Sequence, residues 1–322
     1  MGEAVGAMSG EDGAEGGAGG ESGFRSGFVA LIGRPNVGKS SLCNRLVGDR
    51  VAIVSDKPQT TRWRIAAVLH RPGAQIVFLD TPGIHKPRHQ LGRRMVAAAR
   101  HALDGVEVAV LVVDAGVPGP GQGDRRAALH VRAATCPRLL VCNKADLVPE
   151  AERQARLDAY GSLLPPESGW DGTFLVSALT GEGIAGLLDA LLSRMPAGPP
   201  YFPDDVATDQ PERTLVAELV REQALERLRD EVPHAVAVTT DRWEVRESGL
   251  IYIGATLYVE HESQKGIVIG RGGAMLRAIG EAARHEVERR LGTPVYLDVW
   301  VKVKTGWRDR PGSLETLGIP GG

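Results

Sequence analysis

The order of apolar and polar positions divides the chain into two parts. In the first part, six short apolar runs indicate buried strands, at residues 28–32, 65–69, 76–79, 106–113, 139–142 and 174–176. Segments with helical spacing of apolar residues predict helices between them, at residues 93–103, 122–132, 150–164 and 184–194. Strands that alternate with helices are typical of a mostly parallel sheet covered on both faces. Only the second and third runs are joined by a short turn, Arg71-Pro72-Gly73, which predicts one antiparallel hairpin.

A cluster of proline and glycine at residues 196–200 ends this alternation and predicts a linker. Beyond it, the pattern predicts an amphipathic helix, two strands, a helix and a last strand, at residues 213–231, 235–240, 251–259, 274–291 and 295–303. This order indicates an α+β domain. A length of 322 residues also favours two domains. We therefore expect an α/β domain at 27–196, a linker at 197–211, an α+β domain at 212–310 and a C-terminal tail at 311–322.

Composition and charge indicate which partners and which cellular compartment to expect. The first 26 residues are rich in Gly, Ala, Glu and Ser, so we expect a disordered acidic tail there. The net charge of −2 does not by itself indicate a polyanionic partner. The three cysteines, Cys43, Cys136 and Cys142, form no metal-binding pair and indicate a reducing compartment. No apolar run approaches the ~20 residues that span a bilayer, and we expect a cytosolic protein.

Residues 33–40 fit the pattern G-x-x-x-x-G-K-[ST] and stand between a strand run and a helical pattern. In such a loop the backbone N–H groups surround a phosphate, Lys39 reaches the terminal phosphates, and the Ser40 hydroxyl can ligate magnesium. A chance glycine-rich turn is the alternative, and the position of the match at a strand end disfavours it. The predicted nucleotide contacts are Gly33, Arg34, Pro35, Asn36, Val37, Gly38, Lys39, Ser40 and Ser41.

Two further segments suit a magnesium-bound nucleotide. The motif D-T-P-G follows a strand run, so Asp80 should lie at the carboxyl edge of the sheet and hold the magnesium water shell, while the Gly83 N–H contacts a γ-phosphate. The polar stretch 55–62 has the length of a loop that orders on nucleotide binding, and Thr61 is the preferred magnesium ligand in it. The alternatives are an ordinary strand-exit turn and a plain loop threonine.

The motif N-K-A-D at residues 143–146 predicts which base is bound. The Asp146 carboxylate can accept two hydrogen bonds from guanine, whereas adenine would leave a partly buried carboxylate unpaired. Residues 177–179 close the last strand and could present N–H groups to the guanine O6. Without the phosphate loop, helix capping by Asp146 would be the better interpretation. The predicted guanine-side contacts are Asn143, Lys144, Asp146, Ser177, Ala178 and Leu179.

The order and spacing of these segments resemble the translation-factor-related class of small GTPases. Ile84 follows D-T-P-G, where Ras-like proteins carry a glutamine that positions water, so the resemblance implies slow intrinsic hydrolysis. It assigns catalysis to Lys39, Thr61 and Gly83. Asn36 resembles an asparagine that coordinates an activating potassium ion in some relatives. The magnesium ligands would be Ser40, Thr61 and Asp80, and the further GTP contacts Asp80, Thr81, Pro82, Gly83 and Ile84.

The second domain carries a G-x-x-G motif at residues 270–273, between a short apolar segment and a longer helix. In KH domains this loop clamps a single-stranded nucleic-acid backbone, because glycine lets the main chain approach the phosphates. Residues 264–308 hold nine basic and four acidic residues, which indicates a basic face. A helix-entry turn and a solvated helix face are the alternatives. The predicted RNA contacts are Lys265, Ile267, Ile269, Gly270, Arg271, Gly272, Gly273, Arg277, Lys302 and Lys304.

The closing run at residues 297–307 resembles the L-W-V-K-V-K-x-G-W ending of the Era family of GTPases, and the resemblance covers about residues 28–317. It implies an α/β P-loop GTPase domain, with a mostly parallel sheet and helices on both faces, followed by an α+β type II KH domain. It further implies a switch that binds and slowly hydrolyses GTP, binds the 3′ end of 16S ribosomal RNA, and assists maturation of the small ribosomal subunit. A GTP-bound RNA scaffold that does not cycle is the alternative.

The same resemblance implies the molecules that the protein meets. GTP or GDP, 16S rRNA and the small ribosomal subunit are the expected partners, and Mg²⁺ and K⁺ are the expected cofactors. A cytoplasmic monomer is expected, with the peripheral contact at the inner face of the cell membrane that some relatives make. A tRNA-modification GTPase is disfavoured, because no cysteine-based or one-carbon site follows the GTPase domain.

Overall fold

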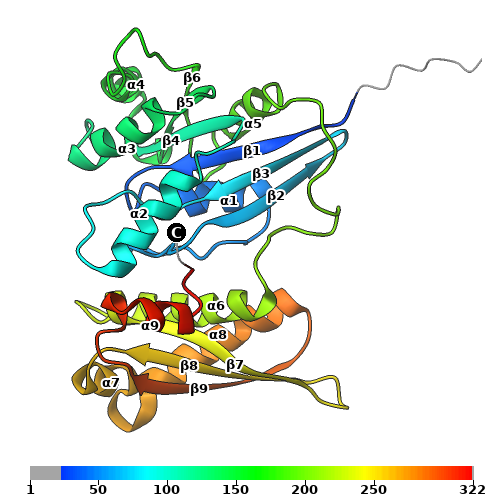
Figure 1. The fold of residues 1–322 in the computed structure, drawn as a ribbon, viewed down its shortest axis with the longest axis vertical. Coiled ribbons are helices and arrows are strands. Elements are labelled where there is room, and N and C mark those ends of the chain that lie inside the picture. Colours follow the sequence, from blue (N-terminus) through cyan, green and yellow to red (C-terminus); the bar gives the residue numbers. More distant parts are fainter. Residues whose placement is uncertain (1–22, 321–322) are drawn as a thin grey trace, which may run out of the picture.

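An α/β domain and an α+β domain are stacked along the long axis of the molecule (Figure 1). The structure is a computed structural model that describes residues 23–320. The predicted acidic tail therefore lies almost wholly outside the described residues, although Arg25 and Ser26 already belong to the first strand. Among residues 23–320, no helix combines the length and the apolar character that crossing a membrane requires.

The first domain is built on a six-stranded sheet in the order β2-β3-β1-β4-β5-β6. All neighbouring strands are parallel except β2 and β3, which form the predicted antiparallel hairpin. Its elements are β1 (Arg25–Ile32), α1 (Lys39–Val47), β2 (Ile65–Arg71), β3 (Ala74–Asp80), α2 (Gln90–His101), β4 (Val108–Asp114), α3 (Gln122–Arg132), β5 (Arg138–Asn143), α4 (Arg153–Gly161), β6 (Gly172–Leu175) and α5 (Ile184–Leu192). The predicted α/β fold with a mostly parallel sheet is confirmed.

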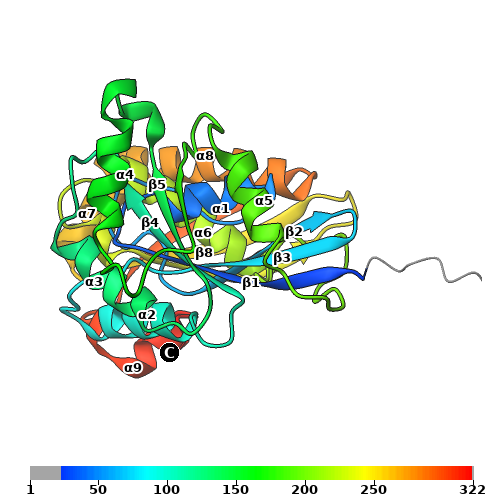
Figure 2. The same ribbon diagram turned by 90° about the horizontal axis from the view of Figure 1, so that it is seen from above.

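Two separate apolar cores cover the two faces of this sheet, and the alternation along β1 shows why. Val29 and Leu31 pack with α1 and α5 on one face, whereas Ala30 and Ile32 pack with α2, α3 and α4 on the other. Because both faces are covered, β4 is buried along its whole length and reads as a continuous apolar run. Figure 2 shows the helices on either side of the sheet. The predicted helix at 150–164 is shorter, because it opens with a 3₁₀ turn at Glu150–Glu152.

The linker after α5 is held against the edge of the sheet. The backbone N–H of Val68 in β2 donates to the Ala207 carbonyl at 2.9 Å, and Ala67 and Thr208 form an antiparallel bridge. Nearer the start of the linker, the buried side-chain amide of Gln75 in β3 donates to the Phe202 carbonyl at 2.8 Å. The predicted linker at 197–211 thus follows the first domain closely before it enters the second.

The second domain has a three-stranded sheet in the order β7-β8-β9, in which β7 is antiparallel and β9 parallel to the central β8. Its elements are α6 (Glu212–Arg227), β7 (Ala237–Val245), β8 (Ile251–Val259), α7 (Glu262–Ile269), α8 (Ala274–Leu291), β9 (Val295–Val303) and α9 (Pro311–Thr316). Side chains of α6 and α8 pack on the sheet around the buried Val220, Leu257 and Ile279. The predicted α+β order is confirmed.

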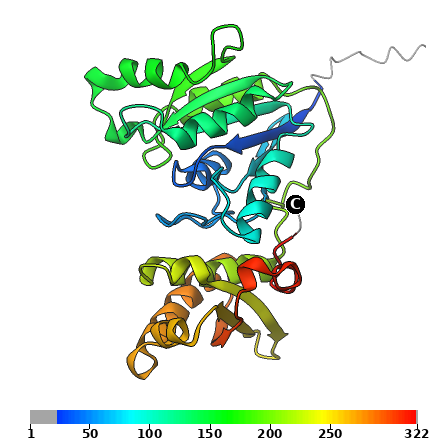
Figure 3. The same cartoon turned by 60° about the vertical axis from the view of Figure 1, so that its left-hand side comes forward.

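Helix α6 differs from the amphipathic helix that the sequence predicts. Every residue from Leu215 to Leu225 is buried, and these include Glu218, Arg221 and Glu222. Figure 3 shows α6 on the side of the second domain that is next to the first. Val220 and Ala224 pack in the core of its own domain, and Glu222 accepts a hydrogen bond from Arg50 of the first domain. The polar side is therefore buried by the other domain rather than exposed to water.

Residues 311–322, expected to form a tail, include α9. Leu314, Leu317 and Ile319 are buried against Leu91 and Met95 of α2 in a cluster that also holds the fully buried Trp307. This cluster joins the end of the chain to the first domain.

Candidate functional site

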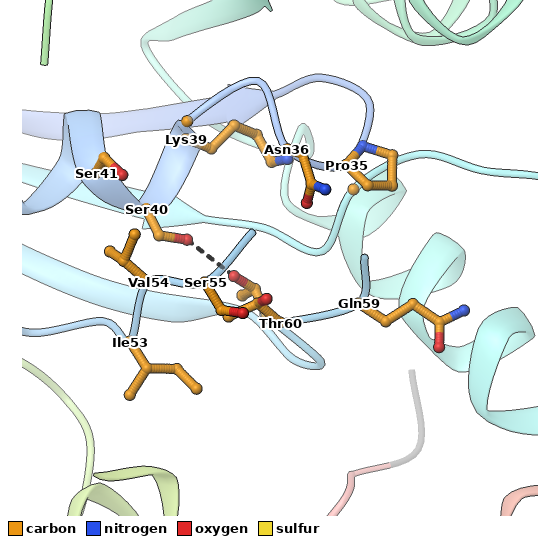
Figure 4. A pocket seen from close by; sticks show the side chains of 13 residues that line it. Pro35, Asn36, Lys39, Ser40, Ser41, Ile53, Val54, Ser55, Gln59 and Thr60 are labelled. Carbon is orange, nitrogen blue, oxygen red and sulfur yellow. Dashed lines mark hydrogen bonds between the residues drawn. The ribbon is translucent and has the colours of Figure 1, made fainter. Parts of the chain in front are cut away.

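The predicted phosphate loop runs from the end of β1 to the second residue of α1, Ser40, and it lines a pocket (Figure 4). Lys39 is buried, and its Nζ lies 3.4 Å from the Gly33 carbonyl oxygen and 3.2 Å from the Arg34 carbonyl oxygen. Burial lowers the pKa of Lys39 to about 8, although the nearby Asp80 opposes the shift. The loop therefore holds a desolvated ammonium at the place where a polyphosphate would lie.

Ser40 and Thr61 line this pocket and both hydroxyls contact the buried Asp80, so the three residues predicted from separate motifs lie together. The Ser40 hydroxyl donates to Asp80 Oδ2 at 2.6 Å and lies 2.9 Å from Thr61 Oγ1. Asp80 is fully buried, and burial raises the pKa of its carboxyl group against the pull of Lys39. Its second oxygen, Oδ1, has no hydrogen-bond partner among the described residues. Two hydroxyls and a carboxylate with a free oxygen form a donor set that suits a hard cation.

The segment after β3 touches the phosphate loop through its backbone. A Cβ added at Gly83 would lie 2.5 Å from the Pro35 nitrogen and 2.7 Å from its Cα, so only glycine fits. The Ile84 N–H donates to the Gly33 carbonyl at 2.9 Å. The Ile84 side chain is 1% exposed and packs in the core beneath α2 and α3. Ile84 thus presents no polar group with which to orient water.

The guanine-side residues form a connected set. Asn143 donates from Nδ2 to the Val37 carbonyl at 2.9 Å and accepts from the Ala178 N–H at 3.0 Å, so it ties the phosphate loop to residues 177–179. The Ser177 hydroxyl donates to Asp146 Oδ1 at 2.5 Å. This contact orients the Asp146 carboxylate and leaves Oδ2 available. Leu179 remains 76% exposed at the rim.

Lys144 and several residues outside the motifs support this arrangement. Lys144 Nζ lies 2.7 Å from Asp114 Oδ2 at the end of β4 and donates to the Asn36 carbonyl at 3.0 Å. Arg45 in α1 donates to the carbonyl oxygens of Ala178 and Leu179. No motif pointed to Arg45 or Asp114. The pocket is also lined by Ile53, Val54, Ser55, Gln59 and Thr60.

The loop at residues 55–62 reaches the second domain, which the sequence did not indicate. The guanidinium of Arg221 in α6 donates to the Thr60 carbonyl, and Glu222 accepts the Val54 N–H at 2.9 Å. Arg62 donates to the Val236 carbonyl at 2.7 Å, and its guanidinium lies 5.3 Å from the centre of the Trp307 ring. One short loop therefore lies between the nucleotide pocket and α6.

In the second domain, the G-x-x-G motif forms a 3₁₀ turn at Arg271–Gly273 between α7 and α8. Gly270 and Gly273 have φ values of 72° and 80°, which other residues adopt at a cost. The Ile267 side chain is 52% exposed beside the loop, and Val268 is buried. Arg271 and Gly272 are exposed around it, whereas Lys265 and Ile269 are partly buried.

A groove runs from this loop between α8 and β9. Gly273 and Arg277 line it together with the exposed Tyr296 and the half-buried Leu297 and Val299. Lys302 and Lys304 do not line the groove, because alternation along β9 places them on the sheet face opposite the helices, where Lys304 Nζ lies 5.9 Å from the Tyr258 ring centre.

Several bases of the predicted basic face are also neutralised. Arg284 pairs with Glu288 at 2.7 Å, and Arg290 pairs with Asp49 of the first domain at 2.5 Å. Arg289 and Arg308 pair with Glu286 and Glu260. The cations near the loop without a close acidic partner among residues 23–320 are Arg271 and Arg277.

Family comparisons match both halves of the chain. A family described as 50S ribosome-binding GTPase matches residues 28–144, and the KH domain family matches residues 231–308. GTPase Era of Heliobacterium modesticaldum is 46% identical over 295 residues, which cover 92% of this chain and 97% of the relative. GTPase Era of Carboxydothermus hydrogenoformans is 46% identical over 297 residues, covering 92% of this chain and 98% of the relative.

Solved structures agree over both domains. A crystal structure of Era in complex with MgGDPNP and nucleotides 1506–1542 of 16S ribosomal RNA matches with a TM-score of 0.87 at 37% identity, covering 92% of this chain and 99% of that chain. An Aquifex aeolicus Era variant bound to GDP·AlF4⁻ matches with a TM-score of 0.87 at 38% identity, with the same coverage.

Proposed function

The chain belongs to the Era family of GTPases, and on that premise we propose that it is a slow GTP switch that binds the 3′ end of 16S ribosomal RNA and assists maturation of the small ribosomal subunit. Its GTPase domain is followed by a KH domain. The observation that carries the proposal is the contact between the Thr60 carbonyl and Arg221, since it joins the loop at the nucleotide pocket to the first helix of the RNA-binding domain. A relative in this family is bound to MgGDPNP and to an rRNA fragment together.

The nucleotide would lie along the phosphate loop with its base against Asp146. Lys39 and the loop N–H groups would hold the β- and γ-phosphates, and the Asp146 carboxylate would accept the two guanine donors. Ser40, Thr61 and Asp80 would hold Mg²⁺, and the unpartnered Asp80 Oδ1 fits such a role. Bound there, the ion would supply positive charge to the phosphate oxygens.

Hydrolysis should be slow, because Ile84 buries its side chain in the core. The groups left to stabilise the transferred phosphoryl are the Lys39 ammonium, the Gly83 N–H and Thr61. Asn36 donates its side-chain nitrogen to the Asp56 carbonyl at 2.6 Å, which leaves its oxygen for a potassium ion. We propose that this ion accelerates turnover, and equal rates in sodium and potassium buffers would contradict the assignment.

The RNA would enter the groove between α8 and β9 with its backbone at the G-x-x-G loop. Arg271 and Arg277 would contact phosphates, and the apolar side chains Ile267, Leu297 and Val299 would lie against bases. Ordering of residues 55–62 by GTP would change the contact of Thr60 with Arg221. The position of the KH domain relative to the GTPase domain would change with it.

Two measurements on the full chain test this function. The first is single-turnover GTP hydrolysis with and without a single-stranded oligonucleotide that has the 16S rRNA 3′-end sequence. We expect slow hydrolysis that the oligonucleotide changes. If GTP is bound and not hydrolysed in either case, the rival function, a GTP-bound RNA scaffold that does not cycle, is correct.

The second measurement is the affinity for the same oligonucleotide. The variant Arg271→Gln/Arg277→Gln should lose roughly tenfold or more of this affinity, because two phosphate contacts are removed. The matched control, Arg242→Gln/Arg246→Gln, removes two charges from the exposed end of β7 in the same domain and should bind normally. Equal losses in the two variants would contradict the RNA assignment.

The remaining features of the proposal concern the state of the protein in the cell. We propose a cytoplasmic monomer, which sedimentation at several concentrations would test. A peripheral membrane contact stays a prediction, and flotation with anionic liposomes would test it.

A further inference from the structure

A groove in the GTPase domain carries a concentration of positive charge that the nucleotide site does not use. It lies between α2 and α3, beside the segment that follows Gly83. Four permanently charged side chains line it: Lys86, Arg93, Arg100 and Arg126. His85, His101 and His130 add ring nitrogens to the same lining.

The charge of this groove is not neutralised within residues 23–320. None of its four permanent cations has an ion-pair partner there, and no carboxylate lines it. Arg93 bonds only to the neutral amide of Gln90 at 3.1 Å. Elsewhere in the described chain, arginines are commonly paired, as Arg153 is with Glu182 and Arg156 is with Glu152. Like charges held close together without counterions repel each other, so the arrangement favours an anionic occupant.

We propose that this cationic groove between α2 and α3 is a second RNA-binding surface, which holds the phosphate backbone of small-subunit rRNA next to the 3′ segment bound by the KH domain. The proposal rests on the proposed function for the choice of partner. Three of the four cations are arginines, whose planar guanidinium pairs with phosphate through two hydrogen bonds. The apolar Leu129, which is 64% exposed, provides surface for a sugar between the phosphates.

The position of the groove suits a continuous RNA. In Figures 1 and 2, the helices α2 and α3 that line the groove and the helix α7 that precedes the G-x-x-G loop all lie toward the left-hand side of the molecule. An acidic protein surface would also match the charge. RNA is favoured because the KH domain already brings rRNA to this side.

An RNA in the groove would also contact His85, which connects the groove to Gly83 and to the loop at residues 55–62. His85 lines the groove, and its Nδ1 lies 2.8 Å from the Gly83 carbonyl oxygen. Its Nε2 lies 3.4 Å from the Gln59 amide nitrogen in the loop at residues 55–62. Occupation of the groove should therefore alter GTP hydrolysis more than binding of the 3′ segment alone.

The test compares two double variants of the full chain. Arg100→Gln/Arg126→Gln removes two charges from the groove. Arg125→Gln/Arg132→Gln removes two exposed charges from α3 outside the groove and serves as the matched control. Two RNA probes are used: the single-stranded 3′-end oligonucleotide, and a longer rRNA fragment that extends further from the 3′ end.

The groove variant should bind the oligonucleotide like the wild type and lose roughly ten- to a hundredfold of the affinity for the longer RNA. Its plot of log affinity against log salt concentration should become less steep by about 1.8, because two phosphate contacts at about 0.9 each are lost. The control should keep both affinities and the slope. Equal affinity of wild type and groove variant for the longer RNA overturns the proposal and leaves an acidic protein as the occupant.

The two RNA probes distinguish a failure of the proposed 3′-end binding by the KH domain from a failure of the groove proposal. If the wild type does not bind the oligonucleotide and the groove variant still weakens binding of the longer RNA, the proposed 3′-end recognition fails and the groove assignment stands. If the wild type binds neither RNA, both proposals fail. A groove variant that unfolds at the same temperature as the control excludes misfolding as the cause of a loss.

Discussion

Arg221 offers a quantitative test of how the two domains are coupled. It is 1% exposed in α6, and its Nε and Nη2 donate to the two oxygens of Glu218 at 2.7 and 2.5 Å. Nη2 also donates to the Thr60 carbonyl of the loop beside the nucleotide pocket. The third nitrogen, Nη1, has no partner within residues 23–320. One buried cation thus serves an ion pair in its own helix and a contact between domains.

The substitution Arg221→Met removes the cation and keeps most of the side-chain volume. Glu218, whose side chain is 10% exposed, is then left as a buried carboxylate without its counter-charge. Removing one partner of a buried pair costs about 3–5 kcal/mol. The double variant Arg221→Met/Glu218→Leu removes both charges and should recover most of this loss, to within about 1–2 kcal/mol of the wild type.

Hydrogen exchange followed by mass spectrometry measures both consequences. The slowest amides of β8, in the core of the second domain, report its free energy of unfolding, and the amides of residues 55–62 report loop opening. We expect faster loop exchange in both variants, because both lose the Thr60 contact. Arg213→Met, an exposed position on the same helix, should change stability by less than about 0.5 kcal/mol. A loss below about 1 kcal/mol for Arg221→Met, or a double variant no more stable than the single one, would refute the reasoning.

Three further predictions concern the nucleotide site. Asp146→Asn should shift preference from guanine toward xanthine nucleotides, because the carboxylate that we propose accepts the two guanine donors is lost; unchanged GTP selectivity in competition binding would exclude the role given to Asp146. The pKa of Lys39 is about 8 without nucleotide, and phosphates should raise it, so binding takes up a proton above that pH. GDP affinity, measured by fluorescence titration, should therefore be steady up to about pH 8 and fall by up to about tenfold per unit above it, whereas a flat profile to pH 9.5 would contradict this. Gly83→Ala would place a Cβ 2.5 Å from the Pro35 nitrogen, and it should weaken GTP at least about tenfold more than GDP in calorimetry, since the proposed function assigns the Gly83 N–H to the γ-phosphate; equal losses would be evidence against that contact.

Local chemistry made the first domain and its pocket predictable. The strand runs were found because both faces of the sheet are covered, and Ser40, Thr61 and Asp80 were found because each stands at a strand end or in a recognisable loop. Boundaries shifted by a few residues, since strand ends carry polar residues such as Asp80 that the apolar pattern omits.

The features that escaped prediction depend on contacts between distant segments. Glu218, Arg221 and Glu222 look like the solvated side of an amphipathic helix, and only the facing domain buries them. Helix α9 has just six residues, and its burial against α2 depends on the domain arrangement. Lys302 and Lys304 were predicted as RNA contacts, and they do not line the groove, because the charge pattern of a strand does not reveal which face lies beside the G-x-x-G loop. Their contact with RNA stays a prediction.

The bonded linker limits how the KH domain can move. Its backbone stays attached to β2 as far as Asp209, whose carboxylate accepts the Ala66 N–H at 3.0 Å, and the Gln210 side chain accepts from the Trp63 indole at 3.0 Å. Helix α6 begins at Glu212, so only Pro211 lies between the last anchored residue, Gln210, and the helix, a span of two Cα–Cα steps or roughly 7 Å. With so short a free tether, the RNA-binding domain cannot search a large volume around the GTPase domain. A change of nucleotide state would instead rotate it about a pivot near Pro211, and this keeps the G-x-x-G loop within a fixed radius of the nucleotide pocket.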